Sequence, residues 1–198
     1  SDDERAYLIN LVNTKKKYGL VWEDKPEDVE EQLRENLPVL KEVKERAIIN
    51  GDEHPNHILI EGDNLHALTA LTFTHEGKID VIYIDPPYNT GIKDFKYNDN
   101  YVDKEDSYRH SKWLSFISKR LEIAKRLLSD SGIMFISIDD NEQSKLKLLT
   151  EEIFREYNSE NYVWVVKDES EGAMPKTARY TVRKEHEYLV ACFKDKSK

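Results

Sequence analysis

The stretch Ile79-Asp-Val-Ile-Tyr-Ile84 is an apolar run of strand length, and it leads directly into Asp85-Pro-Pro-Tyr88. Short apolar runs of this kind are typical of strands that are buried in a sheet. The other such runs are residues 57–61, 133–138, 162–166 and 187–193. Stretches with helical periodicity separate several of these runs, so the chain alternates between predicted strands and predicted helices.

Three predicted helices lie between these strands. One begins at about Asn64, a second extends from Trp113 to Leu128, and a third contains residues 146–153. The second helix ends at the turn signal Ser129-Asp-Ser-Gly132, and the polar residues 85–101 indicate a loop. Parallel neighbours in a sheet require helical crossovers, and the helices then cover both faces. The sequence therefore predicts an α/β fold with a doubly wound, mainly parallel sheet.

The N-terminal quarter has a different pattern. Apolar residues between Leu33 and Val43 recur at spacings of three and four, while Glu and Lys fill most other positions. Pro38 either breaks this segment or begins a new helix, because proline has no N–H to give an interior turn. We therefore predict a helical arm over residues 1–50, followed by the α/β domain over residues 51–198.

Composition excludes several classes of protein. The 198 residues carry a formal net charge of -9, and no run approaches the roughly 18 apolar residues of a membrane span. The start of the chain is acidic, unlike a secretory leader. Cys192 is the only cysteine and the histidines show no metal-ligand spacing, so we expect neither a disulfide nor a bound metal. These features favour a cytoplasmic protein whose contacts with nucleic acid, if any, are local.

Polar residues follow three of the predicted strands. Asp63 and Asn64 follow the first strand, Asp85 the second, and Asp139 and Asp140 the third. Ligands of open parallel sheets bind outside the carboxyl ends of the strands, so these residues are candidates for one site. Asp and Asn are also favoured as helix N-caps and turn formers, and that alternative stays open for both pairs.

The loop Asp85-Pro86-Pro87-Tyr88 has a more specific pattern. Two consecutive prolines remove two backbone donors and restrict the chain, so the loop holds a carboxylate, directed carbonyls and an aromatic ring together. Asp85 and a proline carbonyl can each accept one hydrogen of an NH2 group, while Tyr88 stacks on a planar ring. The pattern indicates a site for a planar group that bears an amine; the alternative is a Pro-rich turn with a buried tyrosine.

The stretch Val81 to Gly91 resembles the catalytic motif of amino-group DNA methyltransferases that use S-adenosylmethionine (SAM). Residues 58–68, 111–116 and 132–142 are similar to segments of the modification subunits of type III restriction-modification systems and their adenine-specific relatives. The resemblance covers most of the chain. It implies a SAM-dependent methyltransferase fold in permuted order, and site-specific methyl transfer to N6 of an adenine flipped out of double-stranded DNA.

The same resemblance implies roles for individual residues. The implied catalytic residues are Asp85, Pro86, Pro87 and Tyr88, and the implied cofactor-binding residues are Asp63, Asn64 and Asp85. Asp at position 85, where cytosine-N4 enzymes of this group more often carry Ser, favours adenine as the target. An Asp of pKa ~3.9 is too weak a base to remove the amine proton before attack, so we expect a direct in-line displacement in which the carboxylate takes or relays the proton afterwards.

One part of the family pattern is absent from this sequence. Methyltransferases of this group need a glycine-rich loop that cradles the methionine half of SAM, but the seven glycines here are isolated from one another. In the permuted order that loop and the target-recognition region follow the catalytic motif. We therefore expect residues 51–198 to be a partial catalytic domain with weak or absent binding of SAM and DNA. For the complete protein, the resemblance implies a homodimer and a restriction-subunit partner.

A cationic stretch near the end of the chain is a further candidate. It consists of Lys176, Arg179, Arg183 and Lys184, which either grip DNA phosphates beside the flipped base or form an ordinary solvated loop. Two other functions remain open. The loop is also suited to another planar amino group, on cytosine N4, RNA or a protein side chain, and the chain is alternatively a catalytically inactive binding or assembly module.

Overall fold

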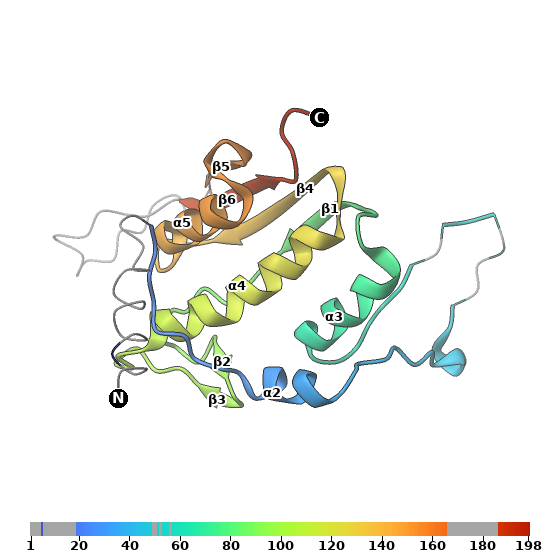
Figure 1. The fold of residues 1–198 in the computed structure, drawn as a ribbon, viewed down its shortest axis with the longest axis horizontal. Helices are drawn as coiled ribbons and strands as arrows, with labels where there is room; N and C mark the ends of the chain where they lie inside the picture. Colours follow the sequence, from blue (N-terminus) through green and yellow to red (C-terminus); the bar gives the residue numbers. More distant parts are fainter. Residues whose placement is uncertain (1–4, 6–18, 49–50, 52, 56, 166–185) are drawn as a thin grey trace, which may run out of the picture.

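The computed structural model describes residues 5, 19–48, 51, 53–55, 57–165 and 186–198. Figure 1 shows the elements in chain order: helix α2 (Asp28–Glu35), the 3-10 helix η1 (Lys44–Arg46), helix α3 (Asn64–His75), strands β1 (Ile79–Ile84), β2 (Lys96–Tyr97) and β3 (Asn100–Tyr101), helix α4 (Arg109–Leu127), strand β4 (Leu128–Ile138), helix α5 (Gln143–Phe154), the 3-10 helix η2 (Glu156–Asn158), and strands β5 (Ser159–Val165) and β6 (His186–Phe193). The described part of the chain is an α/β structure, as the alternation of apolar runs and helical stretches predicted.

Four strands form the main sheet in the order β1-β4-β6-β5. β1 pairs in parallel with β4, with Ile84 opposite Ile136, and helix α4 provides the crossover between them. β6 pairs antiparallel with both β4 and β5. The sheet is therefore mixed, with its parallel pair on the β1 side. β5 and β6 are consecutive strands with no described helix between them, and strands that need no crossover pair antiparallel.

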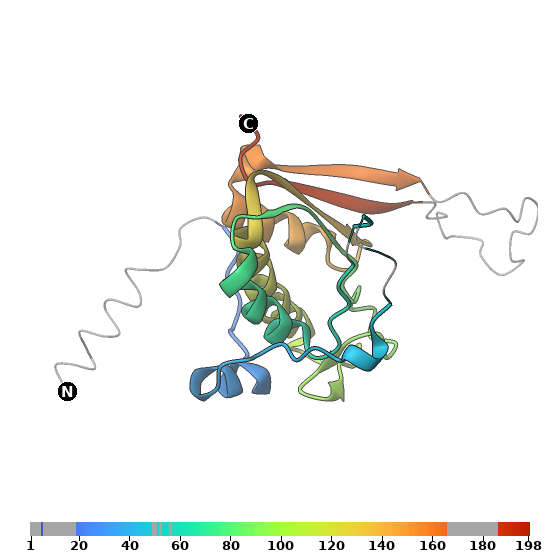
Figure 2. The same ribbon diagram turned by 90° about the vertical axis from the view of Figure 1, so that its right-hand side faces the viewer.

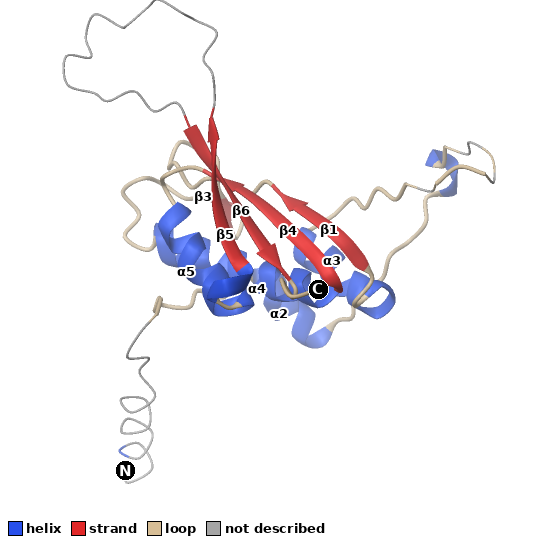
Figure 3. Ribbon diagram, turned by 90° about the horizontal axis from the view of Figure 1, so that it is seen from above, coloured by secondary structure: helices blue, strands red, loops and turns tan. Residues whose placement is uncertain are grey.

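The hydrophobic core lies on one face of this sheet. Helices α3, α4 and α5 all lie against that face (Figure 2, Figure 3). Trp113 and Leu121 of α4 pack with Ile136 of β4 and Cys192 of β6, and all four are 0% exposed. Their burial fixes α4 beneath the middle of the sheet, with its first residues near the carboxyl end of β1.

The opposite face of the sheet differs from the prediction. Val81 and Tyr83 of β1 point to this face and are 60% and 64% exposed. A doubly wound sheet carries helices on both faces, but within the described ranges no helix lies on this one (Figure 3).

The predicted strand over residues 57–61 is wrong. These residues form no ladder with any described strand, and Ile58 and Leu59 are 74% and 95% exposed. The backbone of an exposed extended segment hydrogen-bonds to water, so an apolar run becomes a strand only where a partner strand lies beside it. Helix α3 nevertheless begins at Asn64, as predicted.

The stretch predicted as a loop over residues 85–101 contains a small hairpin of β2 and β3. Its turn residues Asn98 and Asp99 have φ angles of 47° and 60°, which fits a two-residue hairpin turn. Phe95 and Tyr97 are 1% and 6% exposed and belong to the core. The polar composition hid these two anchors, which pack the segment against the domain.

Strand β4 begins earlier than expected. It starts at Leu128, so the predicted turn at residues 129–132 lies inside the strand. Gly132 permits the close approach of β1 here, because a Cβ atom at this position would lie 2.8 Å from the Ile79 carbonyl oxygen. The Gly that suggested a turn therefore serves the packing of two strands.

Within the predicted N-terminal arm, residues 6–18 lie outside the described residues. α2 ends at Glu35, ahead of Pro38, so the helical spacing that continued to Val43 does not form one helix. Residues before α2 lie against α4, where the Trp22 indole and the Lys25 backbone N–H both donate to Ser115 Oγ, at 3.2 and 3.0 Å. In the described part of the chain, no helix combines the length and apolar character that crossing a bilayer demands.

Candidate active site

Asp85 begins the loop that follows β1, at the carboxyl end of the parallel strand pair. Its Oδ1 accepts a 2.8 Å hydrogen bond from Ser137 Oγ on the neighbouring strand β4. The Tyr83 hydroxyl donates to Ser137 Oγ over 3.3 Å. Asp85 is exposed, and its Oδ2 has no hydrogen-bond partner among the described residues. The carboxylate is therefore oriented through one oxygen and available through the other.

The two prolines after Asp85 differ in how their carbonyls are used. The Trp113 indole N–H, from the first turns of α4, donates to the Pro87 carbonyl over 2.7 Å. The Pro86 carbonyl has no hydrogen-bond partner within the described residues. Because Trp113 is 0% exposed, its bond fixes Pro87 from inside the core. Pro86 is buried, and its carbonyl is the one of the two that is left unpaired among the described residues.

Tyr88 completes the predicted four-residue motif. Its ring packs at the edge of the core, and its hydroxyl donates to Glu187 Oε2 of β6 over 3.3 Å. Burial raises the pKa of the Tyr88 phenol to about 12, and the nearby carboxylates of Glu187 and Asp85 add to this effect. The phenol therefore stays protonated near neutral pH, so Tyr88 offers an aromatic ring and a neutral hydroxyl.

Three further residues hold this loop, and the sequence analysis did not assign any of them to the site. They are Ser137 behind Asp85, Trp113 behind Pro87, and Asn89, which follows Tyr88 and is 0% exposed. Trp113 was predicted only as part of the apolar face of a helix. A polar residue directly after the Pro-Pro-Tyr turn was the one available signal for Asn89.

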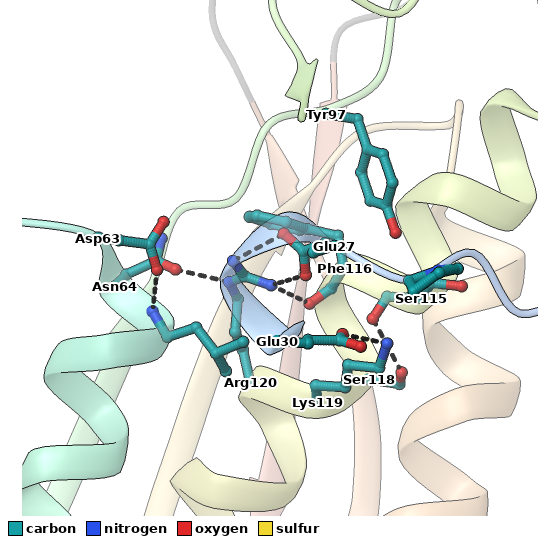
Figure 4. Close-up of polar contacts among 12 residues, drawn as sticks. Glu27, Glu30, Asp63, Asn64, Tyr97, Ser115, Phe116, Ser118, Lys119 and Arg120 are labelled. Carbon is teal, nitrogen blue, oxygen red and sulfur yellow. Dashed lines mark hydrogen bonds and ion pairs between the residues drawn. The ribbon is translucent and has the colours of Figure 1, made fainter. Parts of the chain in front are cut away.

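Asp63 and Asn64 lie at the start of α3 (Figure 4). Asp63 Oδ1 accepts from the backbone N–H groups of Leu65 and His66, at 2.8 and 3.4 Å, so it is the N-cap of this helix. Asn64 Oδ1 accepts from Arg120 Nε over 2.6 Å. Both residues therefore have structural roles, and the alternative reading of Asp63 as a helix cap is confirmed.

Arg120 connects the start of α3 to the N-terminal segment. Its guanidinium lies between Asn64 and Glu27 and makes two bonds to the Glu27 carboxylate, at 2.6 and 3.1 Å (Figure 4). Arg120 and Glu27 are 5% and 6% exposed, so this ion pair is buried. The segment before α2 is thereby attached to the same cluster of residues as the predicted cofactor site.

The predicted site residues fall into two groups. Among the described residues, no hydrogen bond or ion pair joins Asp63 or Asn64 to residues 85–88. Asp139 forms a turn by accepting from the Asn141 backbone N–H over 2.8 Å, and Asp140 accepts from a tyrosine hydroxyl of β6 at 3.0 Å. Asp139 is thus a turn former at the end of β4, which was the alternative reading of that pair.

The two remaining predictions concern the cationic stretch near the end of the chain and metal binding. The cationic residues Lys176, Arg179, Arg183 and Lys184 lie outside the described residues. Within the described ranges, no group of three or more His, Cys, Asp or Glu side chains is arranged to hold a metal ion.

The structure thus places an acidic Pro-Pro-Tyr loop at the carboxyl end of a parallel strand, with one oxygen of Asp85 unpaired among the described residues. Residues 79–198 match the family model of DNA methylases of the N6 and N4 type. This match spans more than half of the chain and includes the whole loop. The chain therefore belongs to the DNA methylase family.

Several curated proteins are similar to this chain. The EcoP15I Mod subunit of a type III restriction-modification enzyme from Escherichia coli is 35% identical over 97% of this chain and 32% of its own length. The probable HindVI Mod subunit of Haemophilus influenzae is 49% identical over 55% of this chain and 14% of its own length. The type II methyltransferase M.KpnI of Klebsiella pneumoniae is 40% identical over 65% and 30%. The chain spans about a third or less of the length of these relatives.

Proposed function

We propose that this chain carries the catalytic loop of a SAM-dependent DNA adenine-N6 methyltransferase that acts in a restriction-modification system. The observation that carries the proposal is the loop itself, in which Asp85 is exposed and neither its Oδ2 nor the Pro86 carbonyl has a hydrogen-bond partner among the described residues, while Ser137 holds Asp85 Oδ1 and Trp113 holds the Pro87 carbonyl. The similarity to type III Mod subunits supports adenine as the target and restriction-modification as the context.

The loop can bind an exocyclic amine through both of its hydrogens. Asp85 Oδ2 accepts one hydrogen and the Pro86 carbonyl accepts the other, while the Tyr88 ring offers a face for stacking. The amine of a paired adenine is blocked in the duplex, so the base has to be flipped out before it can reach this loop. A carboxylate already oriented by Ser137 requires little rearrangement when the base arrives.

The same contacts favour attack by the amine. The nitrogen lone pair of adenine N6 is delocalised into the ring, and hydrogen bonds from both amino hydrogens favour a more pyramidal nitrogen. As the bond from nitrogen to the methyl carbon forms, the bond from that carbon to the sulfonium sulfur of SAM would break and leave a neutral thioether. The nitrogen becomes cationic, and the Asp85 carboxylate stabilises that charge and then accepts the proton. Much of the rate then comes from positioning the two reactants.

The start of α3 fits one part of the cofactor. Asp63 is exposed, its Oδ1 caps the helix, and its Oδ2 has no hydrogen-bond partner in the described part of the chain. That oxygen can accept a hydrogen bond from a hydroxyl or ammonium group, and the carboxylates of Asp63 and Asp85 suit a cationic ligand. We therefore propose that Asp63, Asn64 and Asp85 contact SAM, which supplies the methyl group when it is bound.

The assembly of the complete protein belongs to the same proposal. Similarity to Mod subunits supports DNA as the substrate and a restriction subunit as the partner. We further propose that the DNA is double-stranded and that the full-length form is a homodimer. The cationic stretch at residues 176–184 is proposed to contact DNA phosphates. Residues 51–198 would form part of the catalytic domain and residues 1–50 an arm, in a cytoplasmic protein whose only thiol is unpaired.

Methyl transfer tests this proposal directly. The protein in the full length that its gene encodes is incubated with methyl-labelled SAM and double-stranded DNA of mixed sequence. Asp85→Ala is compared with Asp80→Ala, which removes an exposed carboxylate near the start of β1, at the end of the strand away from the loop. We expect label in N6-methyladenine for the wild type and Asp80→Ala, and a loss of at least about 100-fold for Asp85→Ala.

Other products would select among the alternatives. Label in N4-methylcytosine would replace adenine as the target, and label only in RNA or protein would replace DNA. A full-length protein that binds DNA or a partner but transfers no label to any of these acceptors would support the inactive assembly module.

A further inference from the structure

Asn89 is a buried turn residue at the end of the Pro-Pro-Tyr loop. It has a φ of 58°, in the left-handed region that Asn tolerates better than most residues, and it is 0% exposed. Its side-chain N–H2 donates to the Glu142 carboxylate at 2.6 Å and to the Arg109 carbonyl at 3.2 Å. The loop is therefore held from the inside at the residue directly after Tyr88.

Glu142 is the acceptor of this contact, and its side chain is 0% exposed. Its Oε1 receives Asn89 and also lies 2.5 Å from His110 Nδ1 of α4, while Oε2 lies 3.2 Å from Lys145 Nζ of α5. One carboxylate thus joins the catalytic loop, the first turn of α4 and the first turn of α5. Burial of a carboxylate is costly unless such partners compensate it.

The position of Glu142 in its own helix argues against a merely local role. It is the N-cap residue of α5, where a side-chain oxygen commonly accepts backbone N–H groups of the helix, but its side chain makes no such bond. The turn before α5 is supported instead by Asp139, whose backbone carbonyl accepts from Gln143 and whose side chain accepts from Asn141. The Glu142 carboxylate therefore does not cap α5; its Oε1 contacts Asn89 of the loop, and its Oε2 pairs with the Lys145 side chain.

We propose that Glu142 is a positioning residue for methyl transfer, acting through Asn89 on the loop that holds the target base. The proposal rests on the proposed function of that loop. Asn89 is one residue from Tyr88, and Trp113 holds Pro87 on the same inner side. Loss of the Glu142 contact would leave a buried amide without its acceptor and free the loop end to shift, and a displacement of about 1 Å is enough to lower a rate about 100-fold.

Kinetic analysis of four variants of the full-length protein tests this role. Glu142→Ala and Asn89→Ala remove the two partners, and Glu142→Gln keeps an acceptor oxygen. Glu151→Gln is a control at a more exposed glutamate of α5, whose carboxylate lies 3.7 Å from Lys147 Nζ. We expect kcat to fall about 100-fold in Glu142→Ala with KM for SAM and DNA within about threefold. Glu142→Gln should recover at least about tenfold of that loss, and Glu151→Gln should match the wild type.

A double-mutant cycle shows whether Glu142 acts through Asn89. If it does, the double variant Glu142→Ala/Asn89→Ala is no slower than the slower single variant, within about twofold. Losses in kcat that multiply would overturn the proposal, as would an unchanged kcat in Glu142→Ala. If Glu142→Ala does not fold, the cycle is carried out with Glu142→Met, which keeps a side chain of similar length and has no carboxylate to accept from Asn89.

Hydrogen–deuterium exchange gives a readout that does not depend on activity. Peptides that cover residues 88–95 should exchange at least about tenfold faster in Glu142→Ala than in the wild type, whereas peptides from β4 should not change. Unchanged exchange at residues 88–95 would overturn the contact as the basis of positioning. A wild-type protein that transfers no methyl group would instead defeat the proposed function, while the exchange result would still report on the contact.

Discussion

Two stretches of this chain look alike in sequence and differ in structure. Residues 58–63 and 81–85 both begin with an apolar run and end in an aspartate. The second is a strand paired with β4, and its aspartate is oriented by Ser137. The first is exposed and unpaired, and its aspartate caps a helix. The difference teaches that the chemistry of a loop depends on what lies behind it, more than on its own residues.

Removing Trp113 should destabilise residues 81–85 and the loop after them, here called the anchored stretch, more than any other change. Trp113→Ala leaves a large cavity and frees the Pro87 carbonyl, so we expect a loss of about 3–5 kcal/mol in the free energy of unfolding. Trp164→Ala, at a tryptophan that is 60% exposed on β5, should change it by less than about 0.5 kcal/mol. Urea unfolding measures both. Equal losses for the two variants would show that α4 does not hold the loop.

Breaking the buried ion pair of Arg120 and Glu27 should have the next largest effect. Arg120 also bonds Asn64, directly after the unpaired residues 58–63. Arg120→Met leaves Glu27 buried without its partner, and we expect a loss of about 3 kcal/mol. Adding Glu27→Leu should recover most of it, since a well-packed apolar pair is often as stable as a buried ion pair. Arg126→Met is the control, because its pair with Glu76 is exposed and such surface pairs contribute little to stability. An Arg120→Met loss no greater than that of Arg126→Met would contradict this account.

A smaller effect is expected at the aspartate of the unpaired stretch. Asp63→Ala removes the N-cap of α3 and should cost about 1 kcal/mol, whereas Asp63→Ser keeps a capping oxygen and should cost less. Thermal unfolding of the three proteins measures the difference. SAM binding adds a second readout, because a cap alone predicts similar affinity for Asp63→Ser and the wild type. Weaker SAM binding by Asp63→Ser would show that the carboxylate also contacts the cofactor.

The smallest expected effect is a pH dependence of stability at Asp106, which lies between β3 and α4. A 2.6 Å bond from Lys112 holds the pKa of Asp106 below its ordinary value of 3.8. The carboxylate therefore contributes stability that is fully present above about pH 4 and is lost as the pH falls through its lowered folded-state pKa. Asp106→Asn should flatten the fall of the unfolding free energy below pH 4, compared with Asp99→Asn, which makes the same charge change. Identical acid profiles would show that this ion pair contributes nothing.

Much of the fold follows from local patterns. The strands β1, β4, β5 and β6 and the helices α3, α4 and α5 overlap the apolar runs and helical spacings that predicted them, although β4 begins earlier. Helices α4 and α5 and strands β4 and β6 were predictable because each buries one face in the core. Residues 57–61 have the same local pattern but no partner strand beside them, and pairing is a property of the whole chain. The helical spacing up to Val43 failed for a local reason, since Pro38 interrupts it.

The candidate site was predictable in its outer part only. The four motif residues are consecutive in the sequence, so their pattern predicted the chemistry of the loop. They are Asp85, Pro86, Pro87 and Tyr88. The residues behind them come from α4, β4 and α5, up to 53 positions away for Glu142 and Asn89. Nothing in a single sequence pairs such distant residues. Their partnership arises from the crossover that brings α4 beneath β1 and β4.

The burial of Cys192 has a practical consequence for spectroscopy. It lies in the core on β6, and burial raises the pKa of its thiol to about 12. Alkylating reagents react with the thiolate, so the folded chain should behave at neutral pH as though it contained no cysteine. A single cysteine introduced at Ile92, which is 80% exposed just beyond the Pro-Pro-Tyr loop, would then accept a fluorophore at one defined position. Such a probe could follow the loop in real time as DNA binds, with no background from the native thiol.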